Sequence, residues 1–263
     1  MALPLLLGIL AAITGFLFFN PPAWFPHPIS LAGTQYDQQF QFTLWATGFI
    51  FFAAQLLLAF LIWRFRQTRR NPGPPLHTHG SRPVELLWTA AAAALFAGLA
   101  LSGTRIWAGV HFPPPPRNAE IIEVYAHQFA WSFRYPGPDG KFGRTDIHLI
   151  DDAGQNPFGL DERDPAAQDD ILSSSLKVPA GKEVSLVLHA RDVIHDFFVR
   201  ELRLKQDIVP GMEISYRFRA EKLGTYEIAC SELCGLGHSQ MRATMEVMPQ
   251  GEFDRWKLTH ARK

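Results

Sequence analysis

The run Cys230-Ser-Glu-Leu-Cys234-Gly-Leu-Gly-His238-Ser-Gln-Met241 holds both cysteines of this 263-residue chain. Two thiolates, an imidazole and a thioether are soft or borderline ligands, the set that copper prefers over magnesium or calcium. The spacing would let one loop, folded over a metal, present all four side chains inward. The run therefore predicts a copper-binding loop near the end of the chain.

A disulfide between Cys230 and Cys234 is the plainer alternative, because an exported domain permits one. A zinc site is a second alternative, although a thioether has no natural place in it. His195, between two predicted strands, would add a second imidazole. A single copper of the blue type needs only one thiolate, whereas two sulfurs can bridge two coppers with one histidine on each. Such a site would relay electrons rather than perform bond chemistry.

Two long apolar runs, Leu44–Trp63 and Leu86–Trp107, precede this region. An apolar helix needs about 20 residues to cross the hydrocarbon core, so we expect a transmembrane helical hairpin over residues 44–110. The connecting loop is basic, which places it in the cytoplasm. Its basic residues are Arg64, Arg66, Arg69, Arg70 and Arg82. We therefore expect a multi-pass protein of a bacterial inner (cell) membrane, with its later part in the periplasm or at the cell exterior.

A shorter apolar stretch, Leu3–Phe19, opens the chain. It lacks a basic region before it and a clean cleavage site after it, which favours an uncleaved extra helix over a signal peptide. Both possibilities stay open. Residues 1–43 are assigned to this segment and an outer loop.

Residues 111–263 are expected to form an all-β domain, because short strand-like segments alternate with turn residues. The expected strands are Ile121–Phe133, Glu183–Ala190, Phe197–Leu204, Glu213–Arg219, Thr225–Ala229 and Arg242–Met248. A short helix is expected at Glu252–Thr259. Residues 136–170 are rich in Gly, Pro and Asp and indicate a long loop or insertion.

The charge of the outer part is mildly acidic. From residue 112 onward there are 19 Lys and Arg against 23 Asp and Glu, a balance of −4. This balance argues against a nucleic-acid partner and permits a basic protein partner.

The run CSELCGLGHSQM resembles the binuclear copper A loop of subunit II of the haem-copper oxygen reductases, the cytochrome c oxidases. The segment from Arg191 to His195 resembles the one that carries the family's first histidine ligand. Leu204–Gly211 resembles the stretch that follows it, and Pro83–Thr89 resembles the start of the family's second helix. The resemblance covers nearly the whole chain and implies a helical hairpin followed by a cupredoxin-like sandwich.

This resemblance also implies roles for individual residues. The implied copper ligands are His195, Cys230, Cys234, His238, Met241 and the backbone carbonyl of Glu232. The Glu232 side chain would meet a magnesium at the interface with subunit I. Glu85 would lie at the mouth of a proton channel, or would be an ordinary carboxylate in the headgroup region. Asp192 would lie near the docking face for cytochrome c, or would be a solvated loop charge.

The function that the resemblance implies is that of an electron relay in a terminal respiratory oxidase. The chain would accept electrons from a cytochrome c-type donor and pass them to haem in subunit I. Haem would be bound only in the partner subunit I. Subunit I would reduce oxygen to water, and this reaction would be coupled to proton translocation. One alternative is the copper A subunit of a related nitric oxide reductase. A membrane-anchored copper chaperone is more distant, because there the cysteines precede the histidine.

Two features depart from the family pattern. In His127-Gln128-Phe129-Ala130-Trp131 the second Trp of the family's His-Gln-Trp-x-Trp is kept, but Phe129 replaces the first, over which electrons usually enter. Either electrons enter by another contact, or the donor is not the usual soluble cytochrome c. We hypothesise a different donor, such as a cytochrome domain of a partner respiratory complex. The second departure is the acidic stretch Asp151–Asp170. It could be a solvated insertion, a cation site or a docking patch for a basic donor.

Overall fold

The computed structural model describes residues 2–19, 25–66 and 80–261. The chain divides into two compact units. A helical unit comprises Met1–Phe25 with Asp37–Arg105, and a β unit comprises Pro26–Tyr36 with Ile106–Lys263. Arg69 and Arg70 of the expected basic loop lie outside the described residues.

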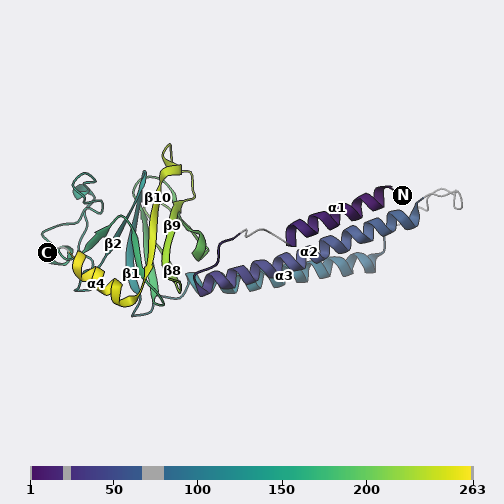
Figure 1. Ribbon diagram of the computed structural model, residues 1–263, viewed down its shortest axis with the longest axis horizontal. Coiled ribbons are helices and arrows are strands. Elements are labelled where there is room, and N and C mark those ends of the chain that lie inside the picture. Colours follow the sequence, from purple (N-terminus) through teal and green to yellow (C-terminus); the bar gives the residue numbers. More distant parts are fainter. Residues whose placement is uncertain (1, 20–24, 67–79, 262–263) are drawn as a thin grey trace. The chain divides into compact units, whose positions relative to one another are not determined.

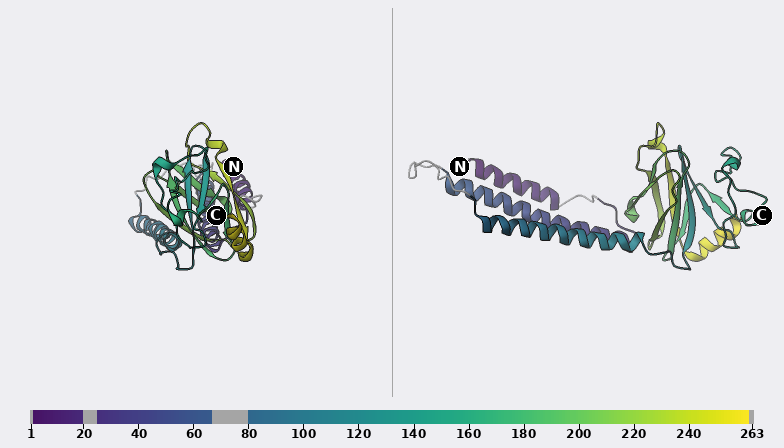
Figure 2. Two further views of the ribbon diagram at one scale, coloured as in Figure 1. Left: turned by 90° about the vertical axis from the view of Figure 1, so that its left-hand side faces the viewer. Right: turned by 180° about the vertical axis from the view of Figure 1, so that it is seen from behind.

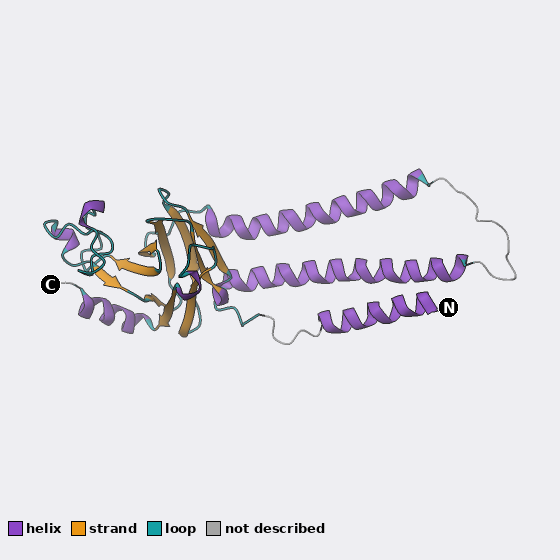
Figure 3. Ribbon diagram, turned by 90° about the horizontal axis from the view of Figure 1, so that it is seen from above, coloured by secondary structure: helices purple, strands orange, loops and turns teal. Residues whose placement is uncertain are grey.

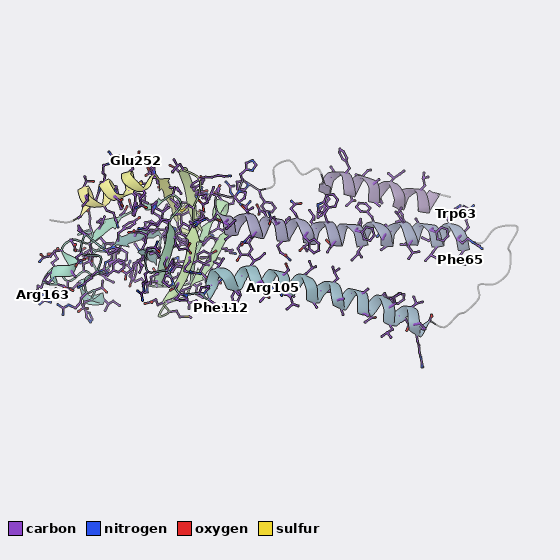
Figure 4. The ribbon with its side chains drawn as sticks, turned by 90° about the horizontal axis from the view of Figure 1, so that it is seen from below. Trp63, Phe65, Arg105, Phe112, Arg163 and Glu252 are labelled. Carbon is purple, nitrogen blue, oxygen red and sulfur yellow. The ribbon has the colours of Figure 1, made fainter. Side chains whose placement is uncertain are left out.

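The helices that precede the strands are α1 (Ala2–Phe19), α2 (Leu31–Phe65) and α3 (Arg82–His111). By length and composition α2 and α3 can each cross a membrane, and their apolar windows are not buried. Figure 4 shows side chains standing out along these helices, with Trp63 and Phe65 at one end of α2. The expected apolar hairpin is confirmed. Both helices are longer than the apolar runs, because the helical conformation also includes the polar residues that flank each run.

Polar contacts and close packing join the three helices. The Gln39 amide of α2 donates to the Leu99 carbonyl of α3 at 3.3 Å and accepts from the Ser102 hydroxyl at 2.6 Å. On the other side of α2, the Phe52 ring lies over Gly15 of α1, where an added Cβ would come within 2.2 Å of the ring. The apolar stretch at the start of the chain is thus a helix that packs on α2 (Figure 1).

The β unit contains two five-stranded sheets that face each other across one core (Figures 1 and 2). The first runs in the order β3 (Ile171–Ser173), β2 (Ala130–Tyr135), β1 (Glu120–His127), β5 (Glu183–Ala190), β8 (Ile214–Arg219). The second runs in the order β4 (Leu176–Pro179), β10 (Arg242–Met248), β9 (Gly224–Cys230), β6 (His195–Val199), β7 (Leu204–Ile208). The expected all-β sandwich is confirmed.

Alternating side chains fill the space between the sheets. In β1, Ile122, Val124 and Ala126 are fully buried, while the residues between them face outward or are half-buried. This is the period of two that a strand with one buried face requires. Helix α4 (Gln250–His260) follows β10 and packs beside β4 of the second sheet, and its Trp256 ring meets Tyr135 of β2 at 4.9 Å.

Two expected strands differ from the observed ones. The segment Ile121–Phe133 is not one strand, because the chain reverses at Gln128 and Phe129 to form the antiparallel β1–β2 hairpin. The segment Phe197–Leu204 is also broken, by a 3-10 turn η3 (Arg200–Leu202) and by Arg203 at φ +57°. Neither reversal uses the Gly, Pro or Asn-Gly that signals a turn in sequence, so the pattern alone could not place them.

Residues 136–170 form a small folded lobe rather than an open loop. Its 3-10 turns η1 (Ile147–Leu149) and η2 (Pro165–Ala167) begin at side-chain caps from Asp146 and Asp164. They are the short helices at the edge of the β unit in Figure 3. A separate apolar cluster of Phe158, Leu160 and Ala167 packs against Tyr125 of β1. The lobe therefore has a core of its own.

The segment Pro26–Tyr36, which leads into and starts α2, belongs to the β unit. The Ile29 amide donates to the Glu201 carbonyl at 3.1 Å, and the Ile29 carbonyl accepts from the Glu221 amide at 2.7 Å. The Arg203 guanidinium donates to the Pro26 carbonyl at 2.7 Å. A fragment that starts near residue 112 would lack these contacts, so solution experiments call for the full chain.

Candidate metal centre

The ends of three strands position the run from Cys230 to Met241. Cys230 ends β9, which pairs with β6 so that Cys230 lies opposite Phe197, two residues after His195. The loop then returns to β10, and the Cys230 amide donates to the Met241 carbonyl at 3.1 Å. Because this bond joins the two ends of the loop, the cysteines, His238 and Met241 are held at one end of the second sheet.

Sulfur and nitrogen atoms converge inside this loop. The sulfurs of Cys230 and Cys234 are 3.8 Å apart. His195 Nδ1 lies 3.9 Å from the Cys230 sulfur, and His238 Nδ1 lies 3.6 Å from the Cys234 sulfur. Met241 Sδ is 3.8 Å from the Cys234 sulfur, and the Glu232 carbonyl accepts from Cys230 Sγ at 3.2 Å. All six expected ligands are thus brought together.

The centre is withdrawn from solvent. His195, Cys230, Cys234 and Met241 are buried, and the ligand atoms of the first three lie within 4.8 Å of one another, close enough to hold a metal ion. Both thiols are free, so the disulfide alternative is not adopted. Burial, followed by the neighbouring Cys230 thiol, raises the pKa of Cys234 to about 11. A metal bound here must therefore displace a thiol proton.

The donor set fits copper better than the hard cations. Two sulfurs, two imidazole nitrogens, a thioether and one carbonyl are the ligand types of soft and borderline metals. The thioether of Met241 points at the sulfur pair although it would add little to a zinc site. The geometry therefore suits a centre in which two thiolates are shared.

Asp192 orients one of the imidazoles. Its Oδ1 lies 2.8 Å from His195 Nε2 and also accepts from the Val193 amide at 2.8 Å. A carboxylate on one ring nitrogen fixes the tautomer and directs the other nitrogen to the metal. Burial acts to raise the pKa of Asp192, but hydrogen bonds from Gln128, His195 and Val193 together outweigh it, so the pKa is lowered. Asp192 thus acts on the centre itself.

The β1–β2 turn covers the loop from outside. The Gln128 side-chain amide donates to the Cys234 carbonyl at 2.6 Å, and its backbone N–H donates to Asp192 Oδ2 at 2.7 Å. The Phe129 ring lies against Gly235 and Gly237, where added Cβ atoms would come within 3.1 and 2.5 Å of it. Phe129 is 39% exposed, so it forms part of the surface over the centre.

Trp131 lies beneath the centre rather than on the surface. It is 3% exposed, and its indole N–H donates to the Met241 carbonyl at 3.4 Å. Its ring meets Phe197 edge-on at 5.4 Å and His195 at 6.3 Å. Trp131 therefore packs as a wall of the centre, and Phe129 is the exposed aromatic residue of the pair.

Glu232 and Glu85 lie in different surroundings. Only the carbonyl of Glu232 faces the sulfurs, and the residue is otherwise exposed. Glu85 belongs to the helical unit, in the first turn of α3, where its amide donates to the Ser81 carbonyl at 2.9 Å. It too is exposed.

Several contributors to the centre were not predicted from the sequence. Gln128 bonds to the copper-type loop, and Ser231 donates to Asp196 at 2.5 Å beside His195. Asp192 was singled out from the sequence only as a docking acid or a solvated charge; its contact with His195 could have been anticipated, because metal-ligating histidines commonly donate their other ring N–H to a carboxylate. The contact of Gln128 depends on a turn that the sequence does not mark.

The sequence of this chain is similar to those of known proteins. Residues 121–248 match the family model described as cytochrome c oxidase subunit II, periplasmic domain. The "Alternative cytochrome c oxidase subunit 2" of Bradyrhizobium diazoefficiens is 35% identical over 97% of this chain and 91% of that protein. The cytochrome c oxidase subunit 2 of Thermostichus vulcanus is 27% identical over 95% of this chain and 82% of that protein.

A solved structure is also similar. The periplasmic domain of subunit II of cytochrome oxidase of Bradyrhizobium japonicum is 27% identical, with a TM-score of 0.41, over 56% of this chain and 96% of that one. Because the Bradyrhizobium diazoefficiens relative exceeds 30% identity across nearly its full length, the chain belongs to the cytochrome c oxidase subunit II family.

Proposed function

We propose that this chain relays electrons in a haem-copper oxidase by means of a binuclear copper A centre. The proposed ligands are His195, Cys230, Cys234, His238, Met241 and the carbonyl of Glu232. The observation that carries the proposal is the convergence of two free buried sulfurs with two imidazoles and a thioether within one closed loop.

Cys230 and Cys234 would hold the copper with their sulfurs, and the bound copper would supply rapid one-electron transfer. The chain's residues prepare the site for this role. Asp192 holds His195 so that Nδ1 faces the sulfurs, and buried Trp131 and Phe197 keep water from one side. Such a site relays charge, and oxygen reduction takes place in subunit I.

The proposed point where electrons enter is the surface formed by Phe129 over Gly235 and Gly237. Phe is harder to oxidise than Trp and lacks the indole N–H, so this surface favours a donor other than the usual soluble cytochrome c. A cytochrome domain of a partner respiratory complex is the proposed donor. Rapid mixing with reduced mitochondrial-type cytochrome c tests this point, and fast reduction of the centre would contradict it.

Further roles follow from the family. Glu232 is proposed to present its exposed carboxylate to a magnesium at the interface with subunit I. Glu85 is proposed to lie at the mouth of a proton channel. The helices α2 and α3 are proposed to span the bacterial inner membrane with the β unit in the periplasm, and α1 is proposed to be retained because it packs on α2.

The nitric oxide reductase alternative is less favoured. The two sequence relatives named above are both described as cytochrome c oxidase subunits. The copper chaperone alternative leaves His238 and Met241 without a role, although both side chains face Cys234. Oxygen is therefore the proposed terminal acceptor.

Anaerobic rapid mixing of the purified complex with its proposed donor, the reduced cytochrome domain of a partner respiratory complex, tests the relay. We expect the absorbance of the copper centre to change before that of the haem. In the Cys234→Ser complex, haem reduction should fall to the background rate. Haem reduction at an unchanged rate in that variant would contradict the proposed function.

A further inference from the structure

The acidic lobe of residues 136–170 is attached to the sandwich at two places by Asp–Arg pairs. At the first, Arg134 of β2 is buried and donates to Asp170 Oδ2 from Nε at 3.0 Å and from Nη2 at 2.6 Å. It also donates to Glu123 of β1 at 2.9 Å. This contact lies on the outer face of the first sheet and explains how the lobe is held.

The second attachment lies beside the metal centre. Arg191 donates from Nη1 to Asp152 Oδ1 at 3.0 Å and from Nη2 to Asp152 Oδ2 at 2.9 Å. This two-pronged geometry is the strong and orienting form of an Arg–carboxylate pair. The Arg191 amide also donates to the Ala126 carbonyl at 3.0 Å, at the end of β1. Asp152 thus reaches from the lobe to the loop that precedes His195.

The next residue, Asp192, connects this loop to the centre. One oxygen of its carboxylate contacts Nε2 of the His195 ring, and the other accepts a hydrogen bond from the backbone N–H of Gln128. Gln128 in turn donates to the Cys234 carbonyl. The Asp152–Arg191 pair is therefore one residue away from a carboxylate that touches both a candidate ligand and the turn carrying Phe129.

We infer that the lobe is a positioning element of the metal centre, and that it acts through the Asp152–Arg191 pair. Because the pair fixes Arg191, it also fixes the position of the next residue, Asp192. Asp192 in turn determines the orientation of the His195 ring and the position of the Gln128–Phe129 turn. This inference rests on the proposed copper site. It assigns to the lobe a role other than a docking patch or a cation site, since Asp152, Asp161, Asp164 and Asp170 each already face an arginine.

The test compares two double variants of the full chain in detergent. Asp152→Asn with Arg191→Gln removes the pair without changing the net charge. The matched control, Asp161→Asn with Arg163→Gln, removes a pair whose members lie 2.9 Å apart within the lobe. Hydrogen exchange of the Gln128 and Val193 amides is measured without metal. Copper affinity and the hyperfine coupling of the His195 nitrogen are measured after copper loading.

In the Asp152/Arg191 variant we expect faster exchange of both amides, an altered His195 coupling, and a loss of copper affinity of up to about tenfold. That loss is smaller than the about 10–100-fold typical of a group that touches the ligand directly. The control should match the wild type. Equal behaviour of the two double variants, changed or unchanged, would overturn the inference. If the wild type binds no copper, the proposed function fails, and the metal-free exchange data still decide the inference.

Discussion

The metal centre and the acidic lobe are both rich in potential ligands, yet they use them in opposite ways. In the lobe, carboxylates meet guanidinium groups, as Asp161 does with Arg163 at 2.9 Å. In the centre, the sulfurs of Cys230 and Cys234 face each other and two imidazoles in a buried space. Ligand type and spacing are therefore not sufficient to mark a site, because the partners that the fold supplies decide whether a ligand stays available.

Replacing a central sulfur should have the largest effect. Cys234→Ser removes the atom that lies between Cys230, His238 and Met241, so the shared-sulfur centre cannot form. We expect loss of the copper chromophore and of bound copper, measured by metal analysis of the full chain. Ser239→Ala, an exposed position of the same loop, is the control and should retain both. Full copper content in Cys234→Ser would contradict the site.

The buried ion pair of the lobe should dominate its stability. Arg134→Met leaves Asp170 buried without its partner, which should lower the free energy of unfolding by about 3–5 kcal/mol. Arg163→Met removes an arginine whose side chain is 84% exposed, and should leave the free energy of unfolding nearly unchanged, because water screens an exposed ion pair. Chemical denaturation of the full chain in detergent measures the free energy of unfolding of both variants. Equal losses in the two variants would show that the lobe is not held at Arg134.

The carboxylate on His195 should affect the centre more than any acid of the lobe. Asp192→Ala frees His195 Nε2, and copper affinity should fall about 10–100-fold. Asp192→Asn can still accept from the ring, so its loss should be smaller. Competition with a copper chelator measures both. An Asn variant as weak as the Ala variant would point to the charge rather than the hydrogen bond.

The Phe129 ring can pack over the centre because the residues beneath it, Gly235 and Gly237, have no side chains. In Gly237→Ala the new Cβ would meet the ring at 2.5 Å, so overpacking should destabilise the fold by about 1–3 kcal/mol. Phe129→Ala in the same chain should recover most of this loss. Gly251→Ala, where a Cβ meets nothing within 4 Å, is the control for thermal unfolding. A loss that Phe129→Ala does not recover would remove the ring as the cause.

The two regions should also respond differently to pH. The raised pKa of Cys234 keeps its thiol protonated at neutral pH, so raising the pH from 6 to 8 should strengthen copper binding. The expected gain is about tenfold per pH unit for each thiol proton displaced. Hydrogen bonds from Arg191 lower the pKa of Asp152, so that attachment should not change over this range. Chelator competition at both pH values measures the first effect, and pH-independent affinity would contradict it.

Much of the architecture could be predicted from local patterns. Apolar length predicts α2 and α3, and period-two alternation predicts the sandwich, because both patterns report directly which surface must be buried. The loop ligands were predictable since ligand type and close spacing lie in one run. His195, distant in sequence, could be assigned with the loop because a second imidazole completes a site with two thiolates, and the family resemblance supports that assignment.

The remaining features depend on contacts between distant segments. The turn at Gln128 carries no Gly or Pro, and Arg203 adopts a left-handed conformation that a long side chain rarely takes. The partners of Asp152 and Asp170 could not be predicted from the sequence of the lobe, because Arg134 and Arg191 belong to the sandwich. Composition predicted an insertion there, but its own core and its two attachments are tertiary features.

Electron paramagnetic resonance of the copper-loaded full chain, combined with metal analysis, tests the central claim most directly. The proposed centre predicts two copper ions per chain, a purple colour, and a spectrum in which one unpaired electron couples equally to both copper nuclei. A single colourless zinc, or coppers that each show a separate spectrum, would contradict a shared-sulfur relay at Cys230 and Cys234.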